Sequence, residues 1–285
     1  MSDLADLVAA ATAQLRAAGV PSPDSDALIL LAHVRGVGLG EVRRLVILGS
    51  PLTAAQTEAY AALLEERANR VPLQHLTGLA GFRRLELAVG PGVFVPRPET
   101  ELVAGLAIAA AESALGPVVV DLCTGSGAIA LAVKDEVPEA VVLAVEISEL
   151  AHAWARRNIE RTGLDVELRL GDATVAFPEL VGAVDVVVSN PPYIPAGMEP
   201  VDPEVRDHDP SVALFGGGDD GLVIPLAVAR RAAVLLRPGG VLIMEHADSQ
   251  GETLPAALRH TGEWRAVRDE RDLNDRPRAT VAVRV

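Results

Sequence analysis

The sequence predicts an α/β protein with a mostly parallel sheet, helices on both of its faces and a C-terminal antiparallel strand, preceded by a small helical domain. Three observations support this. Residues 1–78 show helical spacing of apolar residues and no alternating strand pattern. A short alternating stretch follows at 79–96. From residue 117 onward strands and helices alternate, which is typical of a parallel sheet covered by helices.

The first 78 residues are rich in Ala, Leu and Arg, and we assign them to an N-terminal helical domain. Thr53 with Gln56 is typical of a capping box at the start of a helix. Two roles fit this domain equally: packing support for the rest of the chain, or docking of a macromolecular substrate. The expected helices are 3–18, 23–35, 40–47 and 53–70.

The segment 79–96 is predicted to be a β-hairpin that links two domains. Alternating residues at 81–89, the turn Gly90-Pro91-Gly92 and the apolar residues 93–95 indicate two short strands around a turn. A helix then starts near Pro96 and runs to about 114, since proline and acidic residues favour the first turn of a helix.

The second domain, 97–285, contains the alternating strands and helices. The last strand is expected to pair in an antiparallel hairpin. Strands are expected near 118–122, 141–146, 166–170, 183–189, 241–246, 264–269 and 279–285, and helices near 127–136, 149–162, 220–236 and 250–261.

Composition excludes several classes of protein. The net charge is −14, and Lys134 is the only lysine among 25 basic residues, so the chain lacks the basic face of extended nucleic-acid binders and no direct nucleic-acid substrate is expected. One cysteine allows neither an internal disulfide nor a cysteine-cluster metal site, and we expect no metal. No apolar stretch reaches membrane-spanning length and the N-terminus lacks a signal-peptide pattern, which predicts a cytoplasmic protein without membrane association.

The tetrapeptide Asn190-Pro191-Pro192-Tyr193 is the strongest candidate for chemistry. It follows a β-branched strand at the carboxyl end, where open α/β sheets bind ligands. Two prolines stiffen the loop and remove two N–H donors. The side-chain oxygen of Asn190 and the Pro191 carbonyl then form an acceptor pair beside the Tyr193 ring, which suits a planar NH2 group. A plain rigid turn is the alternative interpretation.

A second signal follows the strand 118–122. Glycines in the loop after it allow close approach of a ligand, and the loop comprises Cys123, Thr124, Gly125, Ser126 and Gly127. Glu146 ends the next strand, roughly 20 residues further, where an acidic side chain holds ribose hydroxyls. Asp172 follows the third strand and is placed to reach the amine of an adenine. These spacings predict an adenosine-containing cofactor.

Two cofactor classes compete for this loop. Gly125, Gly127 and Ala130 also satisfy the dinucleotide fingerprint, which alone is a weak signal. Asp121 lies just before the loop, however, and suits an ammonium group better than a pyrophosphate. The amino acid end of S-adenosyl-L-methionine carries such a group, so this methyl donor is the favoured cofactor.

At this point the chain resembles class I S-adenosylmethionine-dependent methyltransferases that act on amide or exocyclic amino nitrogens, which have a Rossmann-like sheet. More narrowly, the segment Phe94–Glu101, the helical N-terminal part and the segment Glu204–Pro210 are similar to the peptide chain release factor glutamine methyltransferases, the PrmC/HemK family. Asn-Pro-Pro-Tyr alone is shared with adenine-specific DNA methyltransferases. The resemblance covers essentially the full length.

The resemblance implies methylation of N5 of the glutamine in the Gly-Gly-Gln motif of class I peptide chain release factors, with S-adenosyl-L-homocysteine as product. It places Cys123 to Gly127, Glu146, Ala173 and Asn190 at the cofactor, and Asn190, Pro191, Pro192 and Tyr193 at the glutamine. Phe94, Arg97 and Glu99, in the segment that carries the resemblance, are expected at the substrate as well.

Asn190, Pro191 and Tyr193 are the candidate catalytic residues, and positioning rather than a dedicated general base is expected to drive the reaction. The family commonly has Gly where this chain has Cys123 and Asp where it has Glu146. A residue with a side chain takes φ > 0 only at a cost, so Cys123 is expected to be less favourable than glycine in this loop.

Other interpretations stay open. Ribosomal protein glutamine methyltransferases are close siblings of the family, and N6-adenine methyltransferases and a non-catalytic docking protein are more distant alternatives. The segment 194–221 is interpreted as a lid over the peptide or a solvated loop. His246, beside Glu245, is interpreted as a structural histidine.

Overall fold

The computed structural model describes residues 3–285, which divide into two compact units. The helical unit consists of the described residues up to Leu79 together with Pro200–His208. The sheet unit consists of Ala80–Glu199 and Asp209–Val285. Residues 200–208, which the sequence-based boundaries keep in the second domain, therefore group with the helices.

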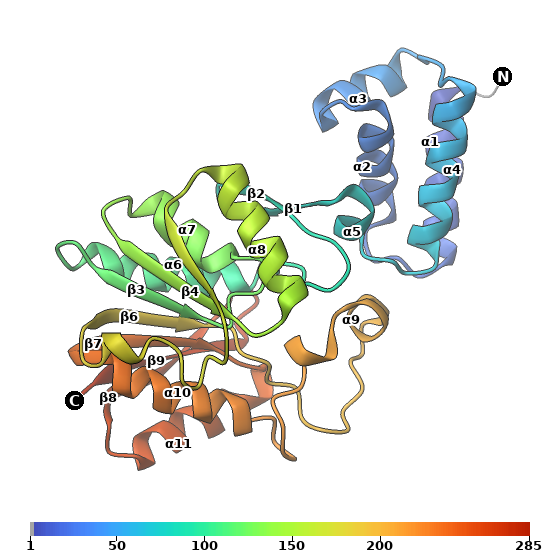
Figure 1. Cartoon of the computed structure of the whole chain (residues 1–285). Coiled ribbons are helices and arrows are strands. Elements are labelled where there is room, and N and C mark those ends of the chain that lie inside the picture. Colours follow the sequence, from blue (N-terminus) through green and yellow to red (C-terminus); the bar gives the residue numbers. More distant parts are fainter. Residues whose placement is uncertain (1–2) are drawn as a thin grey trace. The chain divides into compact units, whose positions relative to one another are not determined.

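The helical unit contains all four helices expected in the N-terminal region (Figure 1). Leu15, Leu30 and Tyr60 are fully buried in its core, and the Tyr60 hydroxyl donates to the Ala27 carbonyl at 2.9 Å. The capping box at Thr53 is confirmed, because its hydroxyl accepts from Gln56 N at 3.2 Å. The helices are α1 (Leu4–Ala17), α2 (Pro23–Arg35), α3 (Leu39–Ile47), α4 (Ala54–Ala68), α5 (Leu73–Thr77) and α9 (Pro203–His208).

Buried ion pairs attach α9 to the other helices of this unit. Arg67 on α4 contacts Asp26 at 2.8 Å and Glu204 at 2.9 Å, and all three side chains are less than 10% exposed. Arg70 contacts Glu204 at 2.5 Å. Burial raises the pKa of Glu204, but the hydrogen bonds from Arg70 and Arg67 outweigh it and hold the pKa at about 2. Glu204 is therefore ionised and paired within the helical unit.

The sheet unit is built on seven strands in the order β5-β4-β3-β6-β7-β9-β8. Neighbours from β5 to β7 pair in parallel, and β9 pairs antiparallel with both β7 and β8, as expected for the C-terminal strands. The strands are β3 (Val118–Leu122), β4 (Val141–Glu146), β5 (Val166–Leu170), β6 (Val184–Ser189), β7 (Leu236–Glu245), β8 (Trp264–Arg271) and β9 (Pro277–Arg284).

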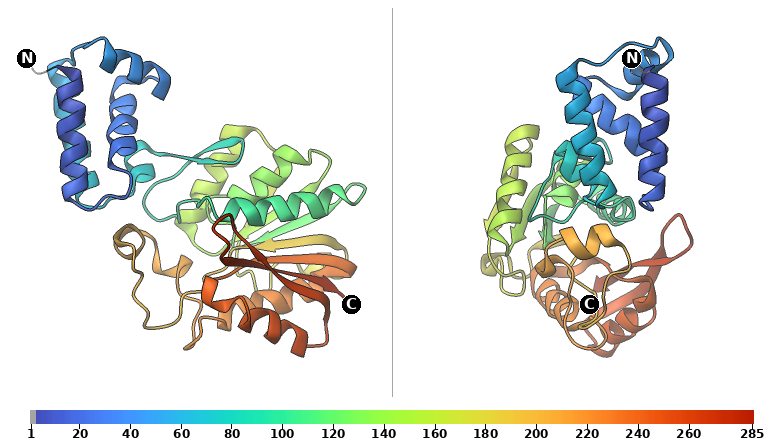
Figure 2. Two further views of the ribbon diagram at one scale, coloured as in Figure 1. Left: turned by 180° about the vertical axis from the view of Figure 1, so that it is seen from behind. Right: turned by 90° about the vertical axis from the view of Figure 1, so that its right-hand side faces the viewer.

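Helices cover both faces of this sheet (Figure 2). One face buries Val119 and Val186 against α6 (Thr100–Glu112), α7 (Ala128–Glu136) and α8 (Glu149–Thr162). The other buries Val120 and Val187 against α10 (Val223–Leu235) and α11 (Thr253–His260). Successive residues of β3 and β6 alternate between the faces, so a continuous β-branched run serves both cores. Three short 3-10 turns complete the unit: η1 (Pro178–Leu180), η2 (Ser211–Ala213) and η3 (Asp248–Gln250).

The predicted position of the hairpin turn is wrong. The two-stranded sheet consists of β1 (Leu79–Phe82) and β2 (Leu85–Ala88), and its turn is Arg83-Arg84, with Arg83 at φ 52°. No glycine or proline marks this turn in the sequence. The segment 90–92 is a separate turn that packs on α8, where the Trp154 indole donates to the Pro91 carbonyl at 3.2 Å. Burial of Val93 and Val95 with Ala151 explains the apolar residues after it.

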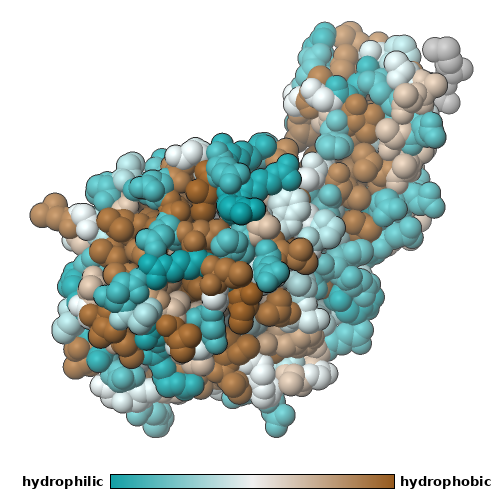
Figure 3. Space-filling view, in the orientation of Figure 1, coloured by the Kyte–Doolittle hydropathy of each residue, from teal (hydrophilic) through white to brown (hydrophobic). Residues whose placement is uncertain are grey.

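Exposed apolar side chains are scattered among polar ones on the face of the sheet unit seen in Figure 3. Just beyond the end of β4, the apolar residues Ile147 and Leu150 have 57% and 64% of their surface exposed. None of the helices formed by residues 3–285 is both long and apolar enough to cross a lipid bilayer.

Candidate active site

The predicted site residues meet at the carboxyl edge of the parallel strands. In the register of the sheet, Leu122 at the end of β3 lies beside Val145 and Ser189, and Glu146 lies beside Leu170. The cofactor loop 123–127, Glu146, Asp172 and the loop 190–193 all follow these strand ends. Because parallel strands end at one edge, the structure brings these predicted residues together, at the place where such sheets bind ligands.

The cofactor loop takes its shape from left-handed backbone conformations. Gly125 and Gly127 have φ of 58° and 85°, values that glycine adopts without strain. Thr124 N donates to the Val145 carbonyl at 3.0 Å, which ties the loop to β4. α7 begins directly after Gly127, so its amino end lies at the carboxyl edge of the sheet.

Cys123 occupies a glycine-like position. Its φ is 71°, in the region that costs a residue with a side chain roughly 1–2 kcal/mol. The sequence predicted that a side chain at this position would meet a conformational cost, and the positive φ of Cys123 confirms it. Burial raises the pKa of the thiol, and the nearby carboxylates of Glu146 and Asp121 raise it further. A neutral thiol is a poor nucleophile, which leaves Cys123 a loop residue rather than a reactive one.

Asp121 is fully buried at the end of β3 and supports the cofactor loop. Its Oδ2 accepts from the Thr124 hydroxyl at 2.6 Å and from Ala130 N at 3.2 Å. Within the described part of the chain its Oδ1 has no hydrogen-bond partner. Burial raises the pKa of Asp121 to about 7, against the lowering effect of those two hydrogen bonds. The unpaired oxygen marks a place where a cationic donor would be stabilising.

Glu146 and Asp172 lie at the next two strand ends. The Glu146 carboxylate accepts from Gly125 N and Ser148 N, both at 2.8 Å, so it joins the β3 loop to the start of α8. Each oxygen keeps a further lone pair. Asp172 is exposed, and its Oδ1 accepts from the amide and hydroxyl of Thr174 at 2.8 and 2.7 Å. Ala173 is buried beside it.

The Asn-Pro-Pro-Tyr loop places its polar groups against α6 and β7. Asn190 Nδ2 donates to the Thr100 hydroxyl at 3.3 Å, which commits the amide nitrogen and leaves the amide oxygen as an acceptor. Pro191 and Pro192 are buried. The Tyr193 hydroxyl donates to Glu245 Oε1 at 3.3 Å, and burial raises its pKa. The ring is thus held at its hydroxyl end.

Two residues that hold this loop in place, Gln250 and Gly216, were not predicted from the sequence. Gln250 is buried, and its Nε2 donates to the carbonyls of Tyr193 and Asp220 at 2.9 and 2.7 Å, while its Oε1 accepts from Ala247 N at 3.0 Å. Gly216 packs so closely that a Cβ would collide with the Gly221 carbonyl and lie 2.7 Å from that of Pro192. The glycine run was visible in the sequence, but its contact partners were not.

Asn158 on α8 was also missed. It is fully buried, and its Oδ1 accepts from Ala88 N at 2.7 Å. Its Nδ2 donates to the carbonyls of Ala88 and Ser126 at 3.0 and 2.9 Å. One side chain thereby fixes β2 to the cofactor loop. Only its polar character on an otherwise apolar helix face could have pointed to it.

The predicted substrate residues Phe94, Arg97 and Glu99 precede α6. Arg97 lies over the Phe94 ring at 5.1 Å and pairs with Asp209 at 2.8 Å, and the Asp209 side chain is fully buried. Glu99 forms the N-cap position of α6 without a side-chain cap bond. Their contact with a substrate stays a prediction.

The neighbouring His246 is a buried structural residue. Its Nδ1 lies 2.9 Å from the Ala247 carbonyl and its Nε2 lies 3.2 Å from Asp269 Oδ1. Burial lowers its pKa. No group of three or more His, Cys, Asp or Glu side chains within residues 3–285 is arranged to hold a metal ion.

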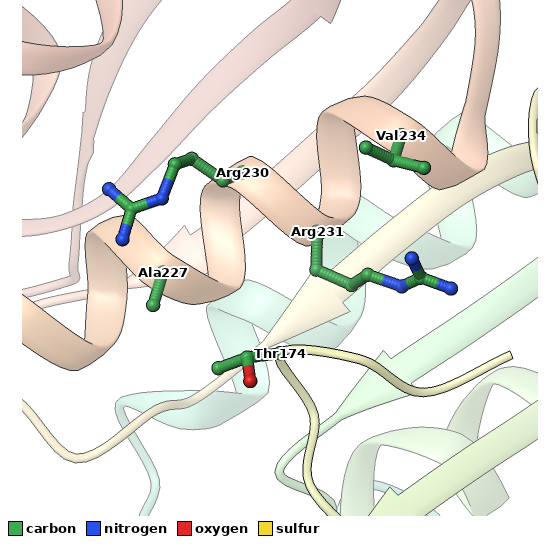
Figure 4. A pocket seen from close by; sticks show the side chains of 5 residues that line it. All are labelled: Thr174, Ala227, Arg230, Arg231 and Val234. Atoms are coloured by element: carbon green, nitrogen blue, oxygen red, sulfur yellow. The ribbon is translucent and has the colours of Figure 1, made fainter. Parts of the chain in front are cut away.

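A separate hollow of about 340 Å³ lies along α10 (Figure 4). The arginines that line it, Arg230 and Arg231, extend in opposite directions along the helix, and Arg231 Nε donates to the Ala176 carbonyl at 2.7 Å. It contains none of the predicted site residues. Its lining consists of Thr174, Ala227, Arg230, Arg231 and Val234.

Comparison with known proteins gives matches over both parts of the chain. A family model described as the PrmC N-terminal domain matches residues 6–78, and one described as the methyltransferase small domain matches residues 86–201. A release factor glutamine methyltransferase of Streptomyces coelicolor is 53% identical over 96% of both chains. One of Bifidobacterium longum is 46% identical over 98% of this chain and 99% of that protein.

Another relative of similar length has a different name. A 4-amino-L-phenylalanine/4-methylamino-L-phenylalanine methyltransferase of Streptomyces pristinaespiralis is 40% identical over 95% of this chain and 92% of its own.

Solved structures confirm the fold class. A methyltransferase of Pyrococcus furiosus has a TM-score of 0.51 at 21% identity, covering 80% of this chain and 98% of its own. The 16S rRNA N2 G1207 methyltransferase of T. thermophilus, in complex with AdoMet and guanosine, has a TM-score of 0.50 at 22% identity. The match covers 73% of this chain and 50% of that protein. The Rossmann-like methyltransferase sheet predicted from the sequence is the fold of this chain.

Proposed function

This chain belongs to the family of release factor glutamine methyltransferases, and from that premise we propose that it methylates the side-chain amide nitrogen, N5, of the glutamine in the Gly-Gly-Gln motif of class I peptide chain release factors. The methyl donor is S-adenosyl-L-methionine, and S-adenosyl-L-homocysteine is the product. Methylation would modulate translation termination, and a release factor substrate places the reaction in the cytoplasm.

One observation carries the proposal for the substrate. The amide nitrogen of Asn190 is committed to Thr100, so the acceptor oxygen of Asn190 is available at the carboxyl edge of β6. In the described chain no hydrogen bond uses the Pro191 carbonyl, which makes it the second acceptor. Two acceptors beside the Tyr193 ring suit the two hydrogens and flat face of a carboxamide NH2.

The residues at the strand ends fit the methyl donor. The unpaired Oδ1 of Asp121 would receive its ammonium group, and the free lone pairs of Glu146 would receive the ribose hydroxyls. Ile147, apolar yet 57% exposed beside Glu146, would supply a face for the adenine, and Asp172 would accept from the adenine amine. When bound, this cofactor supplies a methyl group made electrophilic by a positively charged sulfur.

The protein contributes positioning. An amide nitrogen is a weak nucleophile because its lone pair is delocalised into the carbonyl. Asn190 and the Pro191 carbonyl, by accepting both N–H bonds, would hold the nitrogen in line for transfer and favour its pyramidal form. Orientation of two reactants is worth on the order of 7–11 kcal/mol. The methylated nitrogen becomes strongly acidic and loses its proton to water or to the same acceptors, so no general base is needed.

A second candidate substrate is an aromatic amine. The relative from Streptomyces pristinaespiralis is named for such a substrate, and an arylamine also has a planar NH2 group and a ring. Ribosomal protein glutamine and the N6 amine of adenine are further alternatives with the same local geometry. The net charge of −14 disfavours a nucleic-acid substrate.

Methyl transfer from labelled S-adenosyl-L-methionine separates these candidates. The full-length protein would be incubated separately with a class I release factor, its Gly-Gly-Gln→Gly-Gly-Ala variant, a ribosomal protein, DNA and 4-amino-L-phenylalanine. We expect label in the intact release factor only. Equal labelling of the Gln→Ala variant, or label only in one of the other substrates, would contradict the proposal.

A further inference from the structure

Asn190 is connected to a buried carboxylate through a single hydroxyl. Its Nδ2 donates to Thr100 Oγ1 at 3.3 Å, and Thr100, the first residue of α6, is only 4% exposed. The Thr100 hydroxyl also interacts with the carboxyl of Glu245, the last residue of β7, which is 2% exposed, and this interaction lowers the pKa of Glu245. The Tyr193 hydroxyl donates to Oε1 of the same carboxyl. Both ends of the Asn-Pro-Pro-Tyr loop therefore lead to Glu245.

The number of protons that Asn190, Thr100 and Glu245 share fixes the direction of each hydrogen bond between them. A threonine hydroxyl has one proton to donate, and an ionised carboxylate accepts only. Oε2 of Glu245 is buried and has no hydrogen-bond partner of its own among residues 3–285, so it is the atom free to take the proton of Thr100. The Thr100 oxygen then accepts from Asn190, which must turn its nitrogen toward Thr100. The two ends of an amide are nearly identical in shape, so this network decides which end faces the ligand.

We propose that Glu245, acting through Thr100, is a positioning residue that sets the orientation of the Asn190 amide, so that Asn190 offers its oxygen to an N–H of the substrate. The inference rests on the proposed function and explains how its acceptor is made. A reversed Asn190 would direct its own NH2 at the NH2 of the substrate, and neither group can accept from the other. Methyl transfer would then fail although every side chain is in place.

The charge of Glu245 controls this orientation. Burial raises the pKa of Glu245 to about 7, since its hydrogen bonds with Thr100 and Tyr193 and the positive charge of Arg278 on β9 only partly offset burial, and Glu99 before α6 raises the pKa further. A protonated Glu245 must donate its proton. Given to Thr100, that proton makes Thr100 donate to Asn190 and turns the amide round. The acceptor orientation is thus present above pH 7 and is lost as the pH falls through about 7.

Side-chain NMR of asparagine tests the orientation without any assay of activity. The chain has only four asparagines, Asn69, Asn158, Asn190 and Asn274, so selective ¹⁵N labelling gives four NH2 pairs. An Asn190→Ala variant identifies the pair of Asn190. We expect this pair to titrate with a midpoint near pH 7 in the wild-type protein. The titration should vanish in Glu245→Gln and Thr100→Val and persist in Thr100→Ser.

Two results would overturn the proposal. One is an Asn190 NH2 pair that does not respond between pH 5.5 and 8.5 in the wild-type protein, an interval of about 1.5 units on either side of a pKa near 7. The other is an identical titration in Glu245→Gln, which would assign it to a neighbour such as His246 or Asp269. The exposed Asn274 serves as the internal control, since its pair should be unaffected by any of these substitutions.

Kinetics on a release factor gives the functional readout. Glu245→Gln and Thr100→Val should each lower kcat about 10–100-fold, the range expected for a hydrogen bond to a charged group, with little change in the Kd of S-adenosyl-L-methionine. The double variant should be no worse than either single one, because both break the same connection. Additive losses would contradict the proposal. A wild-type protein that leaves release factors unmethylated would refute the proposed function instead, and the NMR titration would still decide the orientation of Asn190.

Discussion

The loop after β3 and the loop after β6 follow neighbouring strands, but their shapes have different origins. The β3 loop is shaped by its own backbone, with φ of 71°, 58° and 85° at Cys123, Gly125 and Gly127. The β6 loop has two prolines and is fixed from outside, by Gln250 and by the close approach of Gly216. A loop of the first kind lets a ligand approach its backbone closely, whereas a loop of the second kind presents acceptors.

This difference separates the two substrates of the proposed reaction. Changes in the β3 loop should act on the cofactor and remain local. Changes far from the β6 loop in sequence should act on methyl transfer, because the residues that hold that loop come from α6, β7, η3 and the segment 216–221. Four substitutions test this division.

Asn190→Ala should have the largest effect. Removing the acceptor oxygen should reduce kcat for a release factor by roughly 10³-fold, as for the loss of a preorganised hydrogen-bonding group in a transition state, while calorimetry shows cofactor binding nearly unchanged. Asn274→Ala, in an exposed turn, is the matched control. Unchanged turnover would remove Asn190 from the mechanism and erase the contrast between the loops.

Gly216→Ala should come next. The added Cβ has no room between the Gly221 and Pro192 carbonyls, so the β6 loop must shift, and a misplacement of about 1 Å costs up to roughly 10²-fold in rate. Binding of S-adenosyl-L-methionine should be retained. Gly81→Ala, where nothing lies within 4 Å of the new Cβ, is the control and should behave as wild type. Loss of cofactor binding in Gly216→Ala would show that the two loops are not independent.

Asp121 should make cofactor binding depend on pH. Its pKa is raised to about 7 by burial, and only the ionised form pairs with the ammonium group, so the affinity should fall by up to about tenfold per pH unit below 7. The ammonium group itself loses its proton near pH 8, which places the tightest binding between about pH 7 and 8. Calorimetry across pH 5.5 to 9 should show that the affinity of the wild-type protein for the cofactor falls on the acid side of pH 7. The same loss of affinity below pH 7 in Asp121→Asn would show that another group causes it.

Cys123→Gly should have the smallest effect. Glycine adopts the left-handed conformation without strain, which should raise the free energy of unfolding by about 1–2 kcal/mol. The greater conformational freedom of glycine in the unfolded chain should lower it by about 0.4–1 kcal/mol. The melting temperature should therefore rise by about 1–3 °C. Cys123→Ala keeps the Cβ and should not share the gain. An equal gain in both variants would attribute the effect to the thiol and not to the backbone.

Most of the fold could be predicted because its signals are local. The β-branched runs of β3, β4 and β6 and the helical spacing of residues 1–78 are readable one segment at a time. The hairpin turn was misplaced because Arg83-Arg84 has no turn residue, while Gly90-Pro91-Gly92 has three and serves to pack on Trp154. The grouping of α9 with the helices depends on ion pairs between residues over 130 positions apart, which no local pattern reveals.

The residues of the candidate site divide in the same way. The cofactor loop and Asn-Pro-Pro-Tyr were found because their residues are contiguous and follow strands. Thr100, Glu245 and Gln250 were not, since each is an ordinary polar residue whose role arises only when α6, β7 and η3 converge on one loop. The segment 216–221 was taken for part of a lid or solvated loop. Gly216 N donates to the Ile194 carbonyl and the Gly218 carbonyl accepts from Ala196 N, so the segment is bonded to the chain after Tyr193, and its role as a lid stays a prediction.

The small helix α9 makes the architecture hard to dissect. Because Pro200–His208 belongs with the first unit while its flanks belong to the second, the polypeptide passes between the units three times, and a single cut after Leu79 does not separate them. A fragment starting at residue 80 would keep Glu204 but lose Arg67 and Arg70. The buried carboxylate of Glu204 would then lack both arginines with which it forms ion pairs. Chimeras between relatives must therefore exchange both stretches together.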